Sequence, residues 1–253
     1  MEKKIGEIRE EYQAATVMTL PAFIKGYEQD SRAGVLALVK KAKDTLRRIE
    51  EEYSRTEKMK LYENKYGDYQ AICGIDEVGR GPLAGPVVAG AVILPKDCGI
   101  LYLNDSKQLS EKKREELYDT IMKNAVSVGL GFISPERIDE INILQATYEA
   151  MRQAIQKLSV KPDILLNDAV TIPLVEIRQV PIIKGDAKSV SIAAASIVAK
   201  VTRDRLMAEY DSLYPEYGFA GNKGYGAPAH IEALKKYGPS PLHRKTFITH
   251  FCG

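Results

Sequence analysis

Short apolar stretches alternate with helical patterns from about Gly67 onwards. Two of these stretches, residues 71–75 and 86–94, are rich in isoleucine, valine and alanine, which is typical of buried strands. Further strands are predicted over 125–133, 163–167 and 177–183, and helices over 110–123, 134–158 and 189–210. This alternation predicts an α/β domain of three layers around a mixed central sheet.

The first 66 residues differ, and we expect them to form a small, charged helical extension before a main domain over 67–253. Charged side chains make up 27 of the first 70 residues, against 28% of the whole chain. Apolar side chains recur there at steps of three and four, as on one face of a helix: Val35, Val39, Ala42, Leu46, Ile49 and Tyr53. The extension is either an appendage that packs on the main domain or an arm that binds a substrate or partner through nearby cations: Lys40, Lys41, Lys43, Arg47 and Arg48.

Composition sets broad limits. A hydrophobic fraction of 45% excludes a disordered chain, and a net charge of +2 neither requires nor excludes a nucleic-acid partner. Three cysteines, Cys73, Cys98 and Cys252, lack the spacing of a metal site, which favours a reducing, cytoplasmic setting. No apolar run approaches the roughly 20 residues of a membrane span. We expect a monomer that does not enter a membrane.

Carboxylates follow three of the predicted strands. Asp76 and Glu77 end the first strand, Asp168 follows the strand over 163–167, and Asp186 lies just beyond the strand over 177–183. Taken singly, such acids are usually solvated, and Asp186 also suits the first turn of the following helix. Together, they are hard oxygen ligands without histidine or cysteine, a set that indicates Mg²⁺ or Mn²⁺. A pair of these ions is the usual device for hydrolysing a phosphodiester.

Five sequence blocks occur in an order that resembles bacterial ribonuclease HII. The first is Gly-Ile-Asp-Glu-Val-Gly-Arg-Gly-Pro from Gly74, and the resemblance runs from about residue 70 to Phe247. The others are Asn-Asp-Ser-Lys-Gln-Leu-Ser from Asn104, Ile-Asp-Glu-Ile-Asn-Ile from Ile138, Lys-Gly-Asp from Lys184 with Ala-Ala-Ala-Ser-Ile-Val-Ala-Lys from Ala193, and Lys-Gly-Tyr-Gly from Lys223.

The resemblance implies a ribonuclease H-like fold and an endoribonuclease that cuts the RNA strand of RNA–DNA hybrids and single ribonucleotides embedded in duplex DNA. Hydrolysis with two Mn²⁺ or Mg²⁺ ions would leave a 5′-phosphate and a 3′-OH. The implied metal ligands are the same four acids, Asp76, Glu77, Asp168 and Asp186. The positions that recognise the 2′-OH in this family are occupied by Gly79, Arg80, Gly81 and Tyr225.

Phosphate contacts are expected from Ser106 and Lys107, which the resemblance places near substrate. Lys200 and Arg203 lie one turn apart on a predicted helix and either reach backbone phosphates or have a surface role.

One departure concerns Asp168. Many members of the family have glycine after this acid, whereas this chain has Ala169, which makes Asp168 the least secure of the four ligands. Two alternatives remain at this stage: a ribonuclease HIII-type nuclease that is specific for longer hybrids, and a hybrid-binding module without catalysis. The intact Gly-Arg-Gly-Pro sequence disfavours the first, and the presence of all four acids disfavours the second.

Overall fold

A computed structural model describes residues 3–251, and the chain in it divides into two compact units. The first ends at Glu57 and the second begins at Lys58, so the long helix α3 (Ala33–Met59) contributes its last two residues to the second unit. Among the described helices, none combines the length and the apolar character that crossing a bilayer requires.

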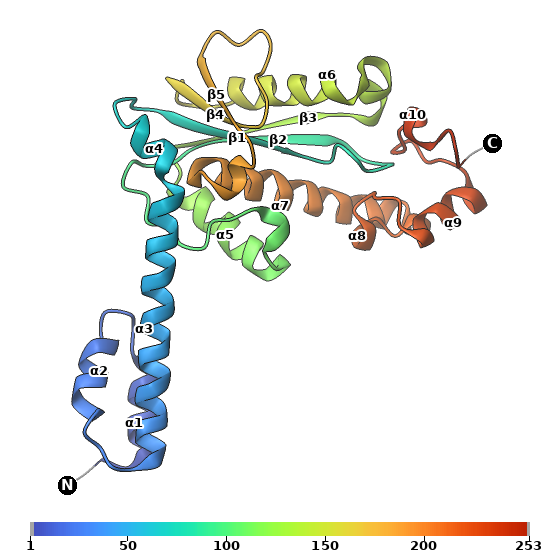
Figure 1. Cartoon of the computed structure of the whole chain (residues 1–253). Helices are drawn as coiled ribbons and strands as arrows, with labels where there is room; N and C mark the ends of the chain where they lie inside the picture. Colours follow the sequence, from blue (N-terminus) through green and yellow to red (C-terminus); the bar gives the residue numbers. More distant parts are fainter. Residues whose placement is uncertain (1–2, 252–253) are drawn as a thin grey trace. The chain divides into compact units, whose positions relative to one another are not determined.

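The N-terminal unit is helical, as predicted. It consists of α1 (Ile5–Ala14), α2 (Leu20–Tyr27) and most of α3 (Figure 1). Its core is formed by side chains such as Ile8, Phe23 and Val35. The predicted apolar stripe of α3 is buried only in its first half. Val39 and Ala42 are buried, but Tyr53 is 51% exposed. The reason is that the core of the unit reaches only as far as Leu46 along α3.

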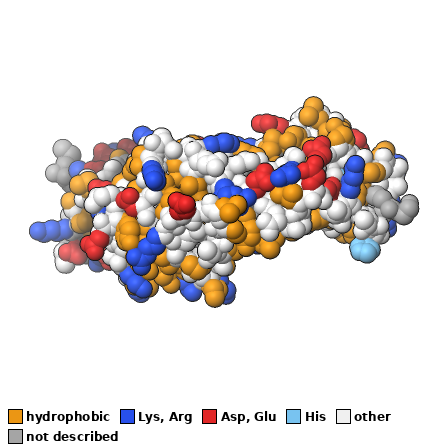
Figure 2. Space-filling model, turned by 90° about the horizontal axis from the view of Figure 1, so that it is seen from above, with side chains coloured by type: hydrophobic (Ala, Val, Ile, Leu, Met, Phe, Trp, Pro, Cys, Tyr) orange, Lys and Arg blue, Asp and Glu red, His pale blue; other side chains and the backbone are white. Residues whose placement is uncertain are grey.

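The five cations that the sequence pointed to on α3 are exposed, but acids accompany some of them. Lys43 lies 3.7 Å from Glu28, and Arg47 lies 3.3 Å from Asp44. Figure 2 shows the same mixture on one face of the molecule, where acidic and basic side chains are interspersed. This agrees with the small net charge.

The second unit is built on the predicted mixed sheet, with strand order β3-β2-β1-β4-β5. Antiparallel pairs join β1 to β2 and β2 to β3, whereas β4 and β5 run parallel to β1. The bounds are β1 (Ile72–Val78), β2 (Val87–Ile93), β3 (Ser127–Ile133), β4 (Ile164–Asp168) and β5 (Arg178–Ile182).

Helices cover both faces of the sheet and complete the predicted three layers (Figure 1). One face carries α6 (Pro135–Gln156) and the other carries α7 (Val190–Leu213) with α5 (Glu111–Asn124) against it. The remaining helices are α4 (Leu61–Lys65), α8 (Phe219–Asn222), α9 (Pro228–Tyr237) and α10 (Lys245–Ile248), with 3₁₀ turns η1 (Ser106–Gln108), η2 (Gly185–Ala187) and η3 (Pro215–Tyr217).

Close approach of α7 to β1 requires small residues. A methyl group on Gly74 would lie 2.0 Å from the carbonyl carbon of Ser191, so only glycine fits there. The predicted small side chains at the start of α7 serve this contact, since Ala193, Ala194 and Ala195 are fully buried.

The long helix α6 is interrupted, which its sequence pattern did not predict. Asn142 has φ +67° and ψ 163°, outside the helical region. Its side-chain oxygen accepts hydrogen bonds from the backbone N–H groups of Leu144 and Gln145 at 3.0 and 3.1 Å. Asn142 therefore restarts the helix as an N-cap would.

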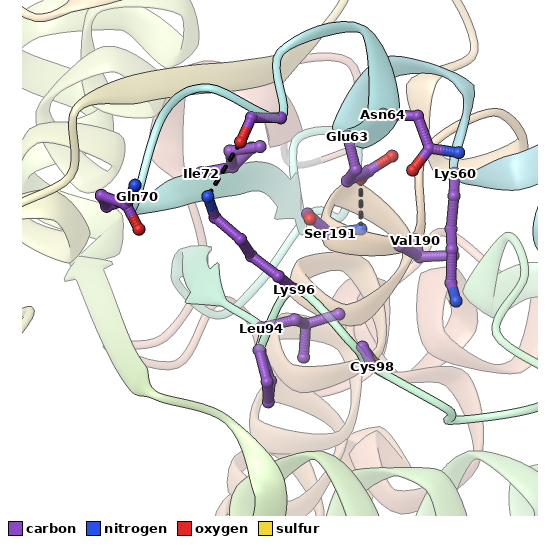
Figure 3. A pocket seen from close by; sticks show the side chains of 12 residues that line it. Lys60, Glu63, Asn64, Gln70, Ile72, Leu94, Lys96, Cys98, Val190 and Ser191 are labelled. Atoms are coloured by element: carbon purple, nitrogen blue, oxygen red, sulfur yellow. Dashed lines mark hydrogen bonds between the residues drawn. The ribbon is translucent and has the colours of Figure 1, made fainter.

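The residues just before the sheet are integral to the second unit. Met59 is 5% exposed in the core formed by β2, α5 and α7. Glu63 of α4 accepts hydrogen bonds from the hydroxyl of Ser189 at 2.5 Å and from the backbone N–H of Ser191 at 3.0 Å (Figure 3). Its carboxylate thus accepts from a backbone N–H that has no partner within the helix, and its negative charge is favourable at the N-terminus of α7.

We predict that a chain starting at Lys65 is less stable than one starting at Lys58. Its free energy of unfolding should be lower by roughly 3–6 kcal/mol, because truncating a buried methionine costs about 2–5 kcal/mol and losing a helix cap costs about 1 kcal/mol. Urea denaturation of both chains measures the difference. Equal midpoints and slopes would show that the second unit does not need Met59 and Glu63.

Candidate active site

The sheet register brings the predicted acids together. Ile75 of β1 pairs with Asn167 of the parallel strand β4, so the next residues, Asp76 and Asp168, are level with each other on neighbouring strands. Asp186 lies in η2, a few residues after β5 ends at Ile182. Parallel strands present their carboxyl ends at one edge, which is the convergence that the sequence predicted.

Hydrogen bonds hold part of three of the four carboxylates. Asp76 accepts from the backbone N–H of Glu77 at 2.8 Å, and Asp168 accepts from that of Gly185 at 2.7 Å. One oxygen of Glu77 accepts from the Arg80 guanidinium at 3.2 Å. Its other oxygen, Oε2, is buried and has no hydrogen-bond partner among the described residues. A buried carboxylate oxygen without a donor is costly unless a ligand supplies one.

The electrostatics of the site are those of crowded, desolvated acids. Burial, followed by the charge of Glu77, raises the pKa of Asp76 well above its usual range. Burial also raises the pKa of Glu77, and the nearby Arg80 opposes this rise. For Asp186, burial together with Asp105 and Asp168 raises the pKa to about 6. All three shifts show that ionised carboxylates are unfavourable here without a compensating cation.

Asp105 is a neighbour that the sequence reasoning did not single out as a site residue. It precedes η1, where its carboxylate accepts from the backbone N–H of Lys107 at 2.9 Å, and its charge acts on Asp186. Its sequence block was already quoted for Ser106 and Lys107. A carboxyl group directly before two expected contact residues was the signal that could have identified Asp105.

The donor set fits a divalent cation. Among residues 3–251, no three acidic, histidine or cysteine side chains stand close enough to form a ready-made metal cluster. The four acids nevertheless offer only hard oxygen ligands, and the unpartnered Oε2 of Glu77 lies among them.

The backbone conformation at Ala169 shows why many members of the family have glycine at this position. Its φ is +55°, in the left-handed region that glycine adopts without penalty and that costs other residues roughly 1–2 kcal/mol. Its backbone N–H donates to the carbonyl of Ile182 at 3.0 Å, which holds the chain after Asp168 against β5. This hydrogen bond continues the contact between β4 and β5 just beyond Asp168.

A tight loop follows Glu77 and reaches the predicted tyrosine. Gly79 has φ +88°, and a methyl group there would lie 2.3 Å from Arg203 Nε. A methyl group on Gly81 would lie 3.9 Å from Tyr225 Cε1, and the Tyr225 side chain is 42% exposed. The Gly-Arg-Gly loop thus lies directly beside Tyr225, and Arg80 links it to Glu77.

The other predicted contact residues differ in exposure. Lys107 is exposed, and its charge acts on both Glu77 and Asp186. Ser106 is 3% exposed, and its hydroxyl accepts a hydrogen bond from Ser196 at 2.9 Å.

The interpretation of Arg203 as a phosphate contact or surface residue is wrong. Its side chain is fully buried and donates to backbone carbonyls. Arg203 follows an apolar stretch of α7 that faces inward, which charge alone did not reveal. Lys200 is partly buried and forms an ion pair with Asp204 at 2.6 Å.

A pocket of about 240 Å³ lies at the other end of the sheet, where β1 begins (Figure 3). Its lining includes Glu63, Ile72 and Ser191, and none of the predicted site residues contributes. The predicted acids lie at or just beyond the opposite, carboxyl ends of β1, β4 and β5.

Comparison with known proteins identifies the family. Residues 73–251 match the family described as Ribonuclease HII, and residues 4–67 match the Ribonuclease HII N-terminal domain. The chain belongs to the ribonuclease HII family. The N-terminal extension, for which the motifs gave no resemblance, is therefore also a known part of ribonuclease HII proteins.

Two curated relatives extend over most of the chain. Ribonuclease HII of Lachnoclostridium phytofermentans is 63% identical over 248 residues, which cover 98% of each chain. Ribonuclease HII of Bacillus subtilis strain 168 is 56% identical over 231 residues, 89% of each chain. Among solved structures, ribonuclease H2 of Pyrococcus horikoshii OT3 is 31% identical with a TM-score of 0.58, and the match covers 70% of this chain and 93% of that one.

Membership of the ribonuclease HII family makes the chain a metal-dependent endoribonuclease with ribonuclease H activity. It removes the alternative of a binding module without catalysis. The predicted ribonuclease H-like fold is also confirmed.

The raised pKa of Asp186 predicts how stability depends on pH without divalent ions. The carboxyl group titrates near 3.8 when unfolded and near 6 when folded, so its stabilising contribution is complete below about pH 3.8 and is lost as pH rises through 6. In EDTA, wild type should lose more unfolding free energy between pH 4 and 7 than Asp186→Asn. Urea denaturation across this range measures the difference.

The exposed Asp119 provides the matched control, because Asp119→Asn should retain the wild-type pH profile. Superimposable profiles of wild type and Asp186→Asn would contradict the shifted titration.

Proposed function

We propose that this ribonuclease HII cuts the RNA strand of hybrids and also incises duplex DNA at a single embedded ribonucleotide, leaving a 5′-phosphate and a 3′-OH. The observation that carries the proposal is the continuity of the site. The loop that begins two residues after Glu77 lies directly against Tyr225, so a sugar recognised there would place its phosphate near the acids.

We assign the metal ligands to Asp76, Glu77, Asp168 and Asp186. Two Mg²⁺ or Mn²⁺ ions held there would supply an activated water and stabilise the leaving oxygen. The chain's own contribution is to hold the carboxylate oxygens at an edge of the sheet that is partly shielded from water. Asp76 is 6% exposed and is anchored by a backbone N–H, so its position changes little when substrate arrives.

Recognition of the ribonucleotide is assigned to Gly79, Arg80, Gly81 and Tyr225. The 2′-OH is the group that distinguishes RNA from DNA, so an enzyme that cuts beside one ribonucleotide must contact it. Glycines allow peptide N–H groups to approach a sugar closely. The half-exposed ring of Tyr225 offers an apolar face on which a sugar can pack.

Phosphate binding is assigned to Lys107, whose exposed side chain is close enough to influence two of the four acids. For Ser106 we propose a supporting role, because its hydroxyl is buried against Ser196. It would hold η1 in place so that Lys107 and the adjacent backbone reach the substrate strand.

Asp186→Asn should abolish cleavage and leave duplex binding intact. The substitution removes one anionic ligand from the proposed metal site but keeps the shape of the side chain, so the loss of turnover should be at least about 100-fold while Kd changes less than about threefold. Single-turnover cleavage with Mg²⁺ and with Mn²⁺, together with fluorescence anisotropy, measures both.

Asp119→Asn, on the exposed side of α5, is the matched control and should cleave normally. Wild-type turnover by Asp186→Asn would remove this residue from the metal site.

Tyr225→Ala should reduce cleavage at a single ribonucleotide at least about tenfold more than cleavage of a continuous RNA–DNA hybrid. A continuous RNA strand presents a 2′-OH at every register, whereas a single ribonucleotide must be found at one position. The ratio of the two kcat/KM values is the readout. Tyr237→Ala, which alters another exposed tyrosine, serves as the control. An unchanged ratio in Tyr225→Ala would reject the recognition role.

A further inference from the structure

Two arginines are buried behind the Gly-Arg-Gly loop. Arg203 of α7 and Arg244, just before α10, are each fully buried. Burial and the charge of Arg203 lower the pKa of Arg244 to about 9, so it remains charged at neutral pH. Removing a guanidinium group from water is expensive unless hydrogen-bond partners surround it.

Backbone carbonyls surround both guanidinium groups. Arg244 donates to the carbonyls of Gly79 at 2.5 Å, Arg80 at 2.9 Å and Gly85 at 2.8 Å. A further bond from its Nε to the Gly85 carbonyl measures 3.0 Å. One side chain therefore holds both ends of the loop at once.

Arg203 joins the same loop to the segment before Tyr225. It donates to the carbonyls of Pro86 at 2.9 Å and Ala84 at 3.1 Å on the loop side, and to that of Lys223 at 2.9 Å on the tyrosine side. In addition, the backbone N–H of Leu83 donates to the carbonyl of Gly224 at 2.8 Å. The spacing between the loop and Tyr225 is thus set from inside the protein.

A histidine pair ties the other side of Tyr225. The backbone N–H of Ser240 donates to Nδ1 of His243 at 3.0 Å, so His243 carries its proton on Nε2 and donates to Nε2 of His230, 3.0 Å away. His230 then donates from Nδ1 to the Tyr225 carbonyl at 2.8 Å. Both rings are buried, and burial lowers the pKa of each, which keeps the pair neutral.

The direction of the carbonyls determines the direction of the N–H groups. In a planar trans peptide, the carbonyl oxygen and the following N–H point to opposite sides. The described residues contain no cis peptide. Because the carbonyls of Gly79 and Arg80 point inward to Arg244, the N–H groups of Arg80 and Gly81 point outward.

We propose that Arg203 and Arg244 are positioning residues for ribonucleotide recognition. They fix the loop over residues 79–86 against Lys223–Tyr225 and turn the N–H groups of Arg80 and Gly81 toward the substrate. The inference rests on the proposed function, in which this loop and Tyr225 read the 2′-OH. Lysine cannot replace either residue, because a single ammonium lacks the planar fork that reaches several carbonyls.

The test compares Arg244→Lys and Arg203→Lys with Arg205→Lys. Arg205 is a partly exposed neighbour on α7 that pairs with Glu115. We expect both buried variants to lower the ratio of kcat/KM for a single ribonucleotide to that for a continuous hybrid at least tenfold. Arg205→Lys should keep the ratio within twofold. A purely structural role would reduce both activities equally, and an unchanged ratio in both buried variants overturns the inference.

Tyr225→Ala in the same assay distinguishes a failure of the proposed recognition site from a failure of the positioning role. If its ratio is unchanged, the proposed recognition site fails. If its ratio falls but those of the two lysine variants do not, only the positioning role fails.

Amide exchange provides a second test that does not depend on folding of the lysine variants. In the Asp186→Asn protein, the N–H groups of Arg80 and Gly81 should exchange readily when free. A bound duplex with one ribonucleotide should slow their exchange at least tenfold more than an all-DNA duplex does. Equal exchange with the two duplexes, or protection already present in the free protein, contradicts the outward orientation.

Discussion

Like charges meet at the carboxyl ends of β1 and β4, where the buried Asp76 adjoins Glu77 and lies level with Asp168. Burial keeps water from screening this repulsion well, and it also raises the pKa of Asp76 and of Glu77. Under the proposed function, this cost is the consequence of keeping hard oxygen ligands at one edge of the sheet. The divalent-metal dependence of the family is consistent with this arrangement, because a cation bound by these acids as we propose would offset their repulsion.

Buried positive charge from distant parts of the chain packs against the segment that follows Asp76 and Glu77. The segment that leaves β1 passes from the acids to a loop whose carbonyls surround Arg203 and Arg244. Under the proposed function, catalysis and substrate recognition are therefore built on one continuous stretch, with carboxylates at its start and guanidinium groups behind its turn. A shift of this loop would move the recognised sugar relative to the acids, which is why rigid support is valuable.

Sequence reasoning succeeded where a single local rule decides the structure. The mixed sheet followed from the alternation of apolar strands and helices, and the convergence of Asp76, Asp168 and Asp186 followed from their places after strands. It failed where distant segments meet. The burial of Arg203 depends on carbonyls some 117 residues away in the sequence, and the cap that Glu63 provides for α7 depends on Ser189 and Ser191. Apolar periodicity did not predict the break at Asn142, because the break depends on a hydrogen bond to the Asn142 side chain.

The most direct test of the account is a count of bound Mn²⁺. Electron paramagnetic resonance measures the free ion during titration of the protein with a duplex that contains one ribonucleotide, using wild type and Asp168→Asn. Asp168 is the informative position because a strained Ala169 follows it. We predict that wild type binds two ions per chain and that Asp168→Asn binds at least one ion fewer or much more weakly. Identical titrations would contradict the claim that the carboxylates of β1 and β4 form one metal centre.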